Sequence, residues 1–136
     1  MSVLGLDVGA KRIGVAVSDP TGSFALPLEV IERGDLREDI ARIVFLAGEH
    51  QAQAIVVGDP IRLNGERGLA SQRIDRFVER LARVWKGKIE RVDERLTTAQ
   101  ATRTLLEADV NRKRRRSVVD KLAAALILDS YLSRPR

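Results

Sequence analysis

The chain begins with three short apolar runs that are separated by polar turns containing glycine. We predict strands at Val3–Val8, Arg12–Ser18 and Phe24–Ile31. The first turn contains Gly9, and the second is the cluster "DPTGS", which is rich in turn-forming residues. Three consecutive strands with such short connections predict an antiparallel meander.

After these strands the spacing of apolar residues changes to that of a helix. Leu36, Ile40, Ile43 and Ala47 recur three or four residues apart, and Asp35 is placed to cap the helix that they predict. The remaining pattern predicts a buried strand at 53–60, a helix at 66–85, a strand at 88–94 and helices at 96–108 and 117–132. The order βββαβαβαα predicts an α/β fold with a five-stranded mixed sheet, three antiparallel strands followed by parallel strands, flanked by helices.

Length and composition limit the class of protein. A chain of 136 residues predicts a single domain, 1–136. The absence of cysteine excludes disulfides, a thiol nucleophile and cysteine-based zinc sites. We find no signal-peptide pattern at the N-terminus and no apolar run of roughly 18 residues, so we expect a cytoplasmic protein without a membrane partner.

Charge is distributed unevenly along the chain. Residues 1–60 carry 5 Lys and Arg against 9 Asp and Glu, whereas residues 61–136 carry 19 against 10. The net charges of the two parts are therefore −4 and +9, which add to the +5 of the whole chain. A basic half on a soluble protein indicates a polyanionic partner, and nucleic acid is the partner that clustered cations favour. Solubility alone is the alternative explanation.

Asp7 stands in the middle of an apolar strand. A buried carboxylate is costly unless a partner or a metal compensates it. Alternation along the strand places Asp7 on one face with Val3 and Gly5, and Gly5 leaves space beside it. Asp7 is therefore the first candidate for a functional side chain.

Two further carboxylates could join Asp7 at one end of the sheet. Glu94 ends the strand at 88–94, and Asp120 lies one turn into the last predicted helix. Oxygen ligands of this kind suit Mg²⁺ or Mn²⁺, and two such ions about 3.5–4 Å apart can activate water for phosphodiester hydrolysis. Each has an alternative role, because Ser117 and Asp120 form a capping-box pattern and Glu94 can pair with a surface arginine such as Arg95.

Cations cluster beside these carboxylates. The run at 112–116 precedes the last predicted helix, where we expect either a phosphate-binding segment or a solvated loop, and it consists of Arg112, Lys113, Arg114, Arg115 and Arg116. Lys11 and Arg12 follow Asp7 and can hold a phosphate near the metal ions. A third group occupies an arc of about 80° on the helix at 66–85, either as a binding surface or as an ordinary polar face, and contains Arg73, Arg76, Arg80 and Arg83.

Other polar residues are given structural roles. His50, the only histidine, is expected at the C-terminal end of the first helix, beside its dipole. The remaining candidates are expected to be turn or surface residues, and they are Asp19, Asp59, Asp109 and Asp129.

Four segments in order resemble the motifs of the YqgF/RuvX family: "GLDVGAKRIGVAVSD", "VVGDPIRLNGERG", "VDERLTTAQA" and "RKRRRSVVDKLAAALILDSYL". The resemblance implies an RNase H-like fold and a divalent-metal nuclease of the cytoplasm, linked to maturation of the 5′ end of 16S rRNA and to cleavage of four-way DNA junctions. It places the family's acidic residues at Asp7, Glu94 and Asp120. The chain departs from the family at Asp59, where an apolar residue is usual, which puts the packing of that loop in question.

We therefore expect a metal-dependent endonuclease that processes the 5′ end of the 16S rRNA precursor. Asp7, Glu94 and Asp120 would hold two Mg²⁺ or Mn²⁺ ions. The expected backbone contacts are Lys11, Arg12, Arg95 and the run 112–116. The alternatives are a Holliday-junction resolvase acting as a homodimer, a non-catalytic protein that binds nucleic acid in ribosomal precursor particles, and a nucleotide-binding regulator.

Overall fold

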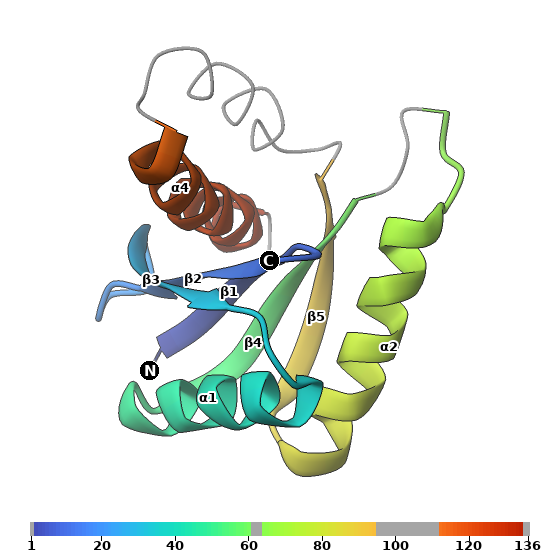
Figure 1. The fold of residues 1–136 in the computed structure, drawn as a ribbon. Helices are drawn as coiled ribbons and strands as arrows, with labels where there is room; N and C mark the ends of the chain where they lie inside the picture. Colours follow the sequence, from blue (N-terminus) through green and yellow to red (C-terminus); the bar gives the residue numbers. More distant parts are fainter. Residues whose placement is uncertain (1, 61–63, 95–111, 135–136) are drawn as a thin grey trace.

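The computed structural model describes residues 2–60, 64–94 and 112–134, and for 112–119 it describes the backbone alone. Arg95 and the helix predicted at 96–108 lie outside the described residues. The element labels follow Figure 1.

The centre of the fold is a five-stranded mixed sheet, as predicted (Figure 1). Its strands lie in the spatial order β3-β2-β1-β4-β5. β1 pairs antiparallel with β2, and β2 with β3, whereas β1 with β4 and β4 with β5 are parallel. The strands are β1 (Ser2–Val8), β2 (Arg12–Ser18), β3 (Ala25–Glu32), β4 (Ala52–Asp59) and β5 (Lys88–Asp93).

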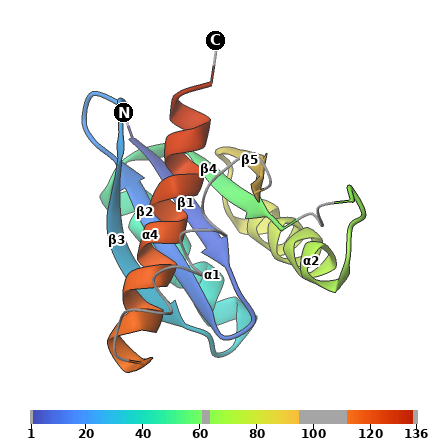
Figure 2. The ribbon, with the colours of Figure 1, turned by 90° about the horizontal axis from the view of Figure 1, so that it is seen from above.

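Helices cover both faces of the sheet (Figures 1 and 2). α1 (Leu36–Glu49) and α2 (Leu69–Val84) pack on one face, where the buried core includes Leu4, Leu6 and Phe77. α4 (Arg112–Leu132) packs on the other face. The alternation predicted for β1 is therefore confirmed, because its even-numbered residues face α1 and α2.

The ends of α1 are those that the sequence predicted. Asp35 is its N-cap, and the Asp35 side chain accepts a hydrogen bond from the backbone N–H of Arg37 at 3.0 Å. His50 is its C-cap. Among the described helices, none is long and apolar enough to cross a membrane.

α4 lies unusually close to the sheet because three neighbouring strands present glycine to it. A Cβ atom on Gly5 of β1 would lie 2.7 Å from Leu128 Cβ, and one on Gly58 of β4 would lie 2.5 Å from Ile127 Cδ1. A Cβ atom on Gly14 of β2 would lie 2.0 Å from the backbone oxygen of Asp120. The space that Gly5 leaves is therefore filled by α4.

Two predictions about α4 are wrong. The helix begins at Arg112 rather than at residue 117, so the basic run 112–116 is helical and is not a loop. Arginine and lysine are good helix formers, and no glycine or proline interrupts this stretch. Since Ser117 stands inside the helix, Ser117 and Asp120 do not form its N-terminal cap.

Candidate functional site

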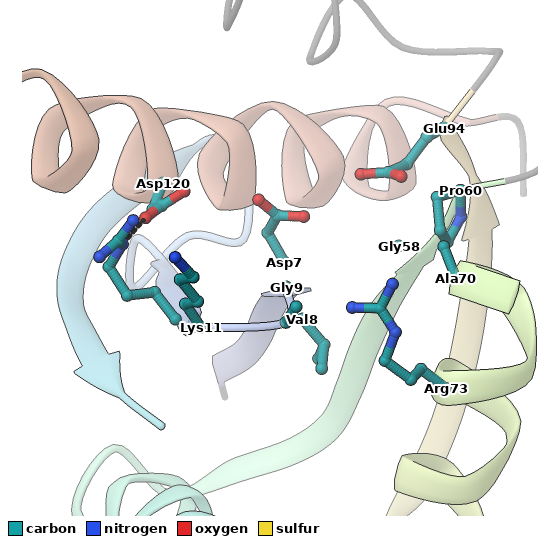
Figure 3. A pocket seen from close by; sticks show the side chains of 12 residues that line it. Asp7, Val8, Gly9, Lys11, Gly58, Pro60, Ala70, Arg73, Glu94 and Asp120 are labelled. Atoms are coloured by element: carbon teal, nitrogen blue, oxygen red, sulfur yellow. Dashed lines mark hydrogen bonds and ion pairs between the residues drawn. The ribbon is translucent and has the colours of Figure 1, made fainter. Parts of the chain in front are cut away.

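Asp7 lies in a pocket of about 380 Å³ at the end of β1 where the strand enters its turn (Figure 3). Its side chain is half-buried and lies on the α4 side of the sheet, and its partner in β2 is Gly14. The chain elements that build the walls are the β1–β2 turn, the end of β4, the start of α2, the end of β5 and α4. The polar and charged side chains that line the pocket are those of Asp7, Lys11, Arg12, Arg73, Glu94 and Asp120.

Asp120 reaches the same pocket from the third turn of α4. Its backbone rests against Gly14, so the position next to Asp7 depends directly on the missing Cβ of that glycine. Arg12 Nε donates a hydrogen bond to Asp120 Oδ2 at 3.1 Å, and Arg12 Nη1 lies 3.8 Å from Glu32 Oε2. Both side chains of the Arg12–Asp120 pair are about one-fifth exposed. Asp120 is thus fixed in orientation by a neighbouring strand.

Glu94 approaches the pocket from the end of β5. It is 4% exposed, so its side chain is buried at the end of the strand. Its Cγ and Oε1 atoms lie 3.2 Å from the position of a Cβ on Gly58, so Gly58 provides the room that this side chain occupies. Pairing with Arg95 lies outside the described residues.

The three carboxylates are the type of ligand that a divalent-cation site requires. Figure 3 shows Asp7 between Glu94 and Asp120 along the length of α4. Carboxylate oxygens are the ligands that Mg²⁺ and Mn²⁺ prefer. Among the described residues, no three acidic, histidine or cysteine side chains are gathered closely enough to hold one ion. The three carboxylates therefore line one pocket without forming a cluster that could hold a single ion.

Cations line two walls of the pocket. Lys11 and Arg12 come from the β1–β2 turn, and Arg73 comes from α2 on the other side of Asp7 (Figure 3). The sequence did not single out Arg73 as a residue of this pocket. The sequence had placed it on a basic arc of the helix, but helical spacing alone does not tell which arginine of the arc reaches a pocket. The side chains of 112–116 are not described, and their backbone forms the first turns of α4.

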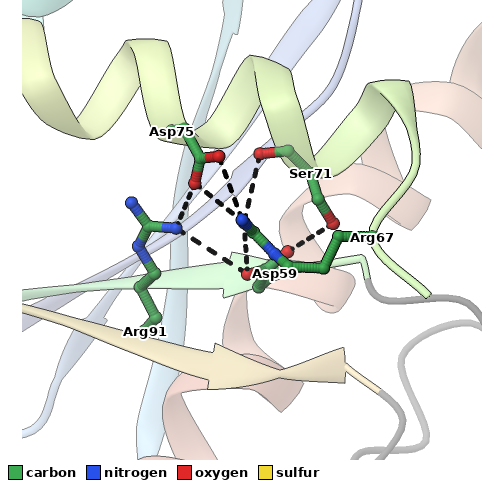
Figure 4. A network of polar contacts seen from close by, with 5 residues as sticks. All are labelled: Asp59, Arg67, Ser71, Asp75 and Arg91. Carbon is green, nitrogen blue, oxygen red and sulfur yellow. Dashed lines mark hydrogen bonds and ion pairs between the residues drawn. The ribbon is translucent and has the colours of Figure 1, made fainter. Parts of the chain in front are cut away.

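The sequence had suggested a turn or surface role for Asp59, and this was wrong. The residue is 5% exposed at the end of β4. Ser71 Oγ donates a hydrogen bond to it at 2.7 Å, and Arg67 Nη2 donates another at 3.0 Å (Figure 4). Arg67 also bonds to Asp75 at 2.8 Å, and Arg91 bonds to Asp75 as well. This network compensates the buried charge and fastens the start of α2 beside the pocket.

The hydrogen bond from Arg67, followed by that from Arg91, lowers the pKa of Asp75 to about 2. Asp75 is therefore ionised throughout the physiological range. Neither Asp75 nor the two arginines that hold it lines the pocket to which Arg73 belongs.

Two other predicted turn or surface aspartates have local structural roles. The Asp19 side chain, itself buried, accepts backbone hydrogen bonds from Ser23 at 2.7 Å and Phe24 at 2.9 Å. The bond from Phe24, followed by that from the Thr21 hydroxyl, lowers the pKa of Asp19 to about 2. Asp129 accepts from the backbone N–H of Ala25 at 2.7 Å and so ties α4 to β3. Asp109 lies outside the described residues.

Comparison with protein families gives a match over nearly the whole chain. The model described as "RuvX: Holliday junction resolvase" matches residues 1–134. A protein of Symbiobacterium thermophilum is 49% identical over 132 residues, which cover 97% of this chain and 92% of that protein. One of Thermoanaerobacter pseudethanolicus is 46% identical over 133 residues, covering 97% and 96%. Both carry the name "Putative pre-16S rRNA nuclease".

Solved structures confirm the fold class. RuvC of T. thermophilus in complex with a Holliday junction substrate has a TM-score of 0.59 and 17% identity, covering 96% of this chain and 94% of that one. The complex of fowlpox virus resolvase with Holliday junction DNA has a TM-score of 0.52 and 9% identity, covering 98% and 100%. At these identities the likeness establishes the RuvC-like RNase H fold alone.

Proposed function

The chain belongs to the RuvX family, and from this premise we propose that it is a divalent-metal-dependent endonuclease that processes the 5′ end of the 16S rRNA precursor. A nuclease role is supported by the family and by the names of its relatives. Dependence on metal, the identity of the substrate and the position of the cut are our inference. We further propose that residues 1–136 form one cytoplasmic nuclease domain.

One observation carries this proposal. Asp7, Glu94 and Asp120 are separated by long stretches of sequence, yet they line a single pocket together with Lys11 and Arg73. Acidic side chains that line one small space repel one another, and a bound divalent cation would relieve that repulsion. A phosphodiester also needs positive charge on both sides of its path, and the two pocket walls carry it.

The residues that line the pocket would have separate roles in metal binding, positioning and substrate binding. When bound, Mg²⁺ or Mn²⁺ would supply an activated water and neutralise charge on the leaving oxygen. Asp7, Glu94 and Asp120 would hold the ions. Arg12 would hold Asp120 in place through the 3.1 Å bond. Lys11 and Arg73 would hold the backbone of the substrate strand across the pocket, which fixes the phosphorus in line.

We keep the other predicted contacts as part of this proposal. Arg95 and the run 112–116 would add positive charge near the pocket, since one follows Glu94 directly and the other begins the helix that carries Asp120. Arg12, although engaged with Asp120, remains close enough to the pocket to contact a phosphate as well.

The second candidate function is resolution of four-way DNA junctions. The description of the matching family favours it. This activity needs two active sites that face two strands, so it requires a symmetric homodimer. A third reading, a non-catalytic protein of ribosomal precursor particles, predicts binding without cleavage.

Cleavage of two labelled substrates, side by side with Mg²⁺ and with Mn²⁺, tests these alternatives. One substrate is a 16S precursor with its 5′ leader, and the other is a mobile four-way DNA junction. We expect Asp7→Asn to lower the rate by at least about 100-fold, because even residues that only support metal ligands cost 10- to 100-fold. Asp35→Asn is the matched control, since asparagine caps helices equally well and α1 lies outside the pocket.

The outcomes separate the three readings. Cleavage of the precursor alone supports rRNA processing, and cleavage of the junction by a dimer supports resolution. Binding of either substrate without cleavage in both metals, by wild type and Asp7→Asn alike, would rule out the nuclease proposal in favour of an assembly protein.

A further inference from the structure

α2 carries a row of four exposed arginines, Arg73, Arg76, Arg80 and Arg83, which we call the arginine ridge. At 100° per residue they lie within an arc of about 80°, and at 1.5 Å per residue they extend over about 15 Å of the helix. The ridge flanks the apolar side of α2, whose buried residues include Ile74, Phe77 and Leu81. The ridge is therefore a fixed feature of a packed helix.

The two ends of the ridge lie in different hollows. Arg73 lines the pocket that contains Asp7. Arg80 and Arg83 line a second hollow of about 490 Å³ between α1 and α2, where Arg37 contributes a further cation from α1. A continuous row of positive charge thus leads from the pocket to the groove between the two helices.

Nearby acidic residues do little to neutralise this row. Asp75 belongs to the same helix, but its carboxylate is held by Arg67 and Arg91 on the other flank (Figure 4). Glu79 pairs with Arg83 at 2.8 Å, and both side chains are 65% exposed. An exposed pair of this kind is weak and readily exchanged for a phosphate.

We propose that the arginine ridge binds the phosphate backbone of the duplex flanking the cleaved strand, which makes structured nucleic acid with a helical arm the preferred substrate. The inference rests on the proposed nuclease function and deepens it. Phosphates of one strand advance about 3.4 Å per base pair along a DNA duplex, and by that value about 15 Å covers about four base-pair steps. Backbone contacts of this type fix the register of the substrate without reading its sequence.

Continuity with the catalytic pocket favours nucleic acid over an acidic protein as the occupant. The second hollow has apolar residues, Ile40, Val44 and Val84, which an acidic amphipathic helix could also cover. Such a partner would explain Arg80 and Arg83 but would leave Arg76, which lies between them and the pocket cation Arg73, without a role. A duplex that enters the pocket at one end accounts for the whole row.

The test compares two labelled RNAs that share the same cleaved segment, one of which carries an added duplex arm of about ten base pairs, enough to pass the roughly four steps of the ridge. All proteins carry Asp7→Asn, so that binding is measured without cleavage. The test variant is Arg80→Gln with Arg83→Gln. The control is Arg42→Gln with Arg134→Gln, which removes the same charge from two exposed arginines that line neither hollow.

We expect the arm to tighten binding by wild type and by the control but not by the test variant. With the value for duplex DNA, losing two phosphate contacts makes the slope of log K against log salt concentration shallower by about 1.8. Between 50 and 200 mM salt, the affinity of the test variant should therefore fall about tenfold less than that of wild type. An arm that adds nothing to wild-type binding, or that adds as much in the test variant, would overturn the inference. Binding of polyglutamate to the ridge without an arm effect would overturn it in favour of a protein partner.

Failure of this inference is distinguishable from failure of the proposed function. A protein that cleaves the precursor but ignores the arm remains a nuclease with another route for its substrate. A wild-type protein that neither binds nor cleaves either RNA refutes both.

Discussion

Replacing Gly14 with alanine should separate Asp120 from Asp7. The added Cβ would lie 2.0 Å from the Asp120 backbone oxygen and 2.6 Å from its carbonyl carbon, whereas ordinary contacts begin at 3.4 Å. The obstacle is helix backbone, which cannot move aside as the end of a side chain can. α4 must therefore shift by up to the 1.4 Å that separates 2.0 from 3.4 Å.

Two consequences follow from this displacement. Overpacking of this kind costs about 1–3 kcal/mol of the free energy of unfolding. A shift of about 1 Å in a catalytic group lowers the rate by about 100-fold. We therefore expect Gly14→Ala to lose activity far beyond what its loss of stability explains, at a temperature where it remains folded.

Gly48→Ala is the matched control, because no atom lies within 4 Å of its added Cβ and the residue stands inside α1. Alanine should stabilise that helix by about 0.5–1 kcal/mol. Urea unfolding monitored by circular dichroism gives the free energy of unfolding of both variants, and cleavage of the labelled precursor gives their rates. A Gly14→Ala protein with wild-type stability and wild-type rate would refute the close approach of α4 on which the site depends.

Three other substitutions test separate parts of the structure. Asp19 has a pKa of about 2 in the folded protein against an ordinary 3.8. Its ionised form therefore adds to the free energy of unfolding fully above pH 3.8, and this contribution is lost as the pH falls toward 2. Asp19→Asn should flatten the pH dependence of the free energy of unfolding in that window, as measured by urea unfolding. Arg67→Ala should lower the free energy of unfolding by about 1–3 kcal/mol, because it leaves the buried Asp59 with fewer hydrogen-bond donors. Asp59→Leu should lower it by less, because an apolar residue often replaces a buried charge at little loss of stability. The reverse order in thermal denaturation would contradict this account of the network. Arg12→Gln should lower the free energy of unfolding by about 1–3 kcal/mol, because the Arg12–Asp120 pair is mostly buried. It should also lower the cleavage rate by about 10- to 100-fold at a temperature where the variant is folded, since Asp120 loses its positioning partner. A folded variant with the wild-type cleavage rate would make Arg12 merely structural.

Much of the fold could be predicted from local pattern. Apolar alternation located all five strands to within one or two residues, and the order of elements predicted the mixed sheet. The start of α4 could not be located in this way, because a run of cations has no apolar period. Its charges suggested a flexible segment, whereas its intrinsic helix propensity determined the outcome.

The candidate site was predicted in part. Alternation in β1 placed Asp7 on the face opposite to Leu4 and Leu6, and the structure shows Asp7, Glu94 and Asp120 lining one pocket. The roles of Arg12 and Arg73 depend on contacts between distant elements, which spacing along one element does not encode. Asp59 was misjudged for the same reason, since its donors come from the start of α2, beyond the strand in which it stands.

The close seat of α4 on the sheet has a consequence for chains that are only partly folded. Asp120 lies on α4 and is 108 positions from its partner Arg12 on β2. Because α4 brings Asp120 to the pocket, the proposed metal site exists only while α4 is docked on the sheet. Detachment of one helix exposes less surface than global unfolding and is therefore the more accessible opening. A chain in that state would keep Lys11 and the arginines of α2 and could still hold RNA, yet it could not cut. Incomplete folding would then silence the enzyme rather than release an unspecific nuclease.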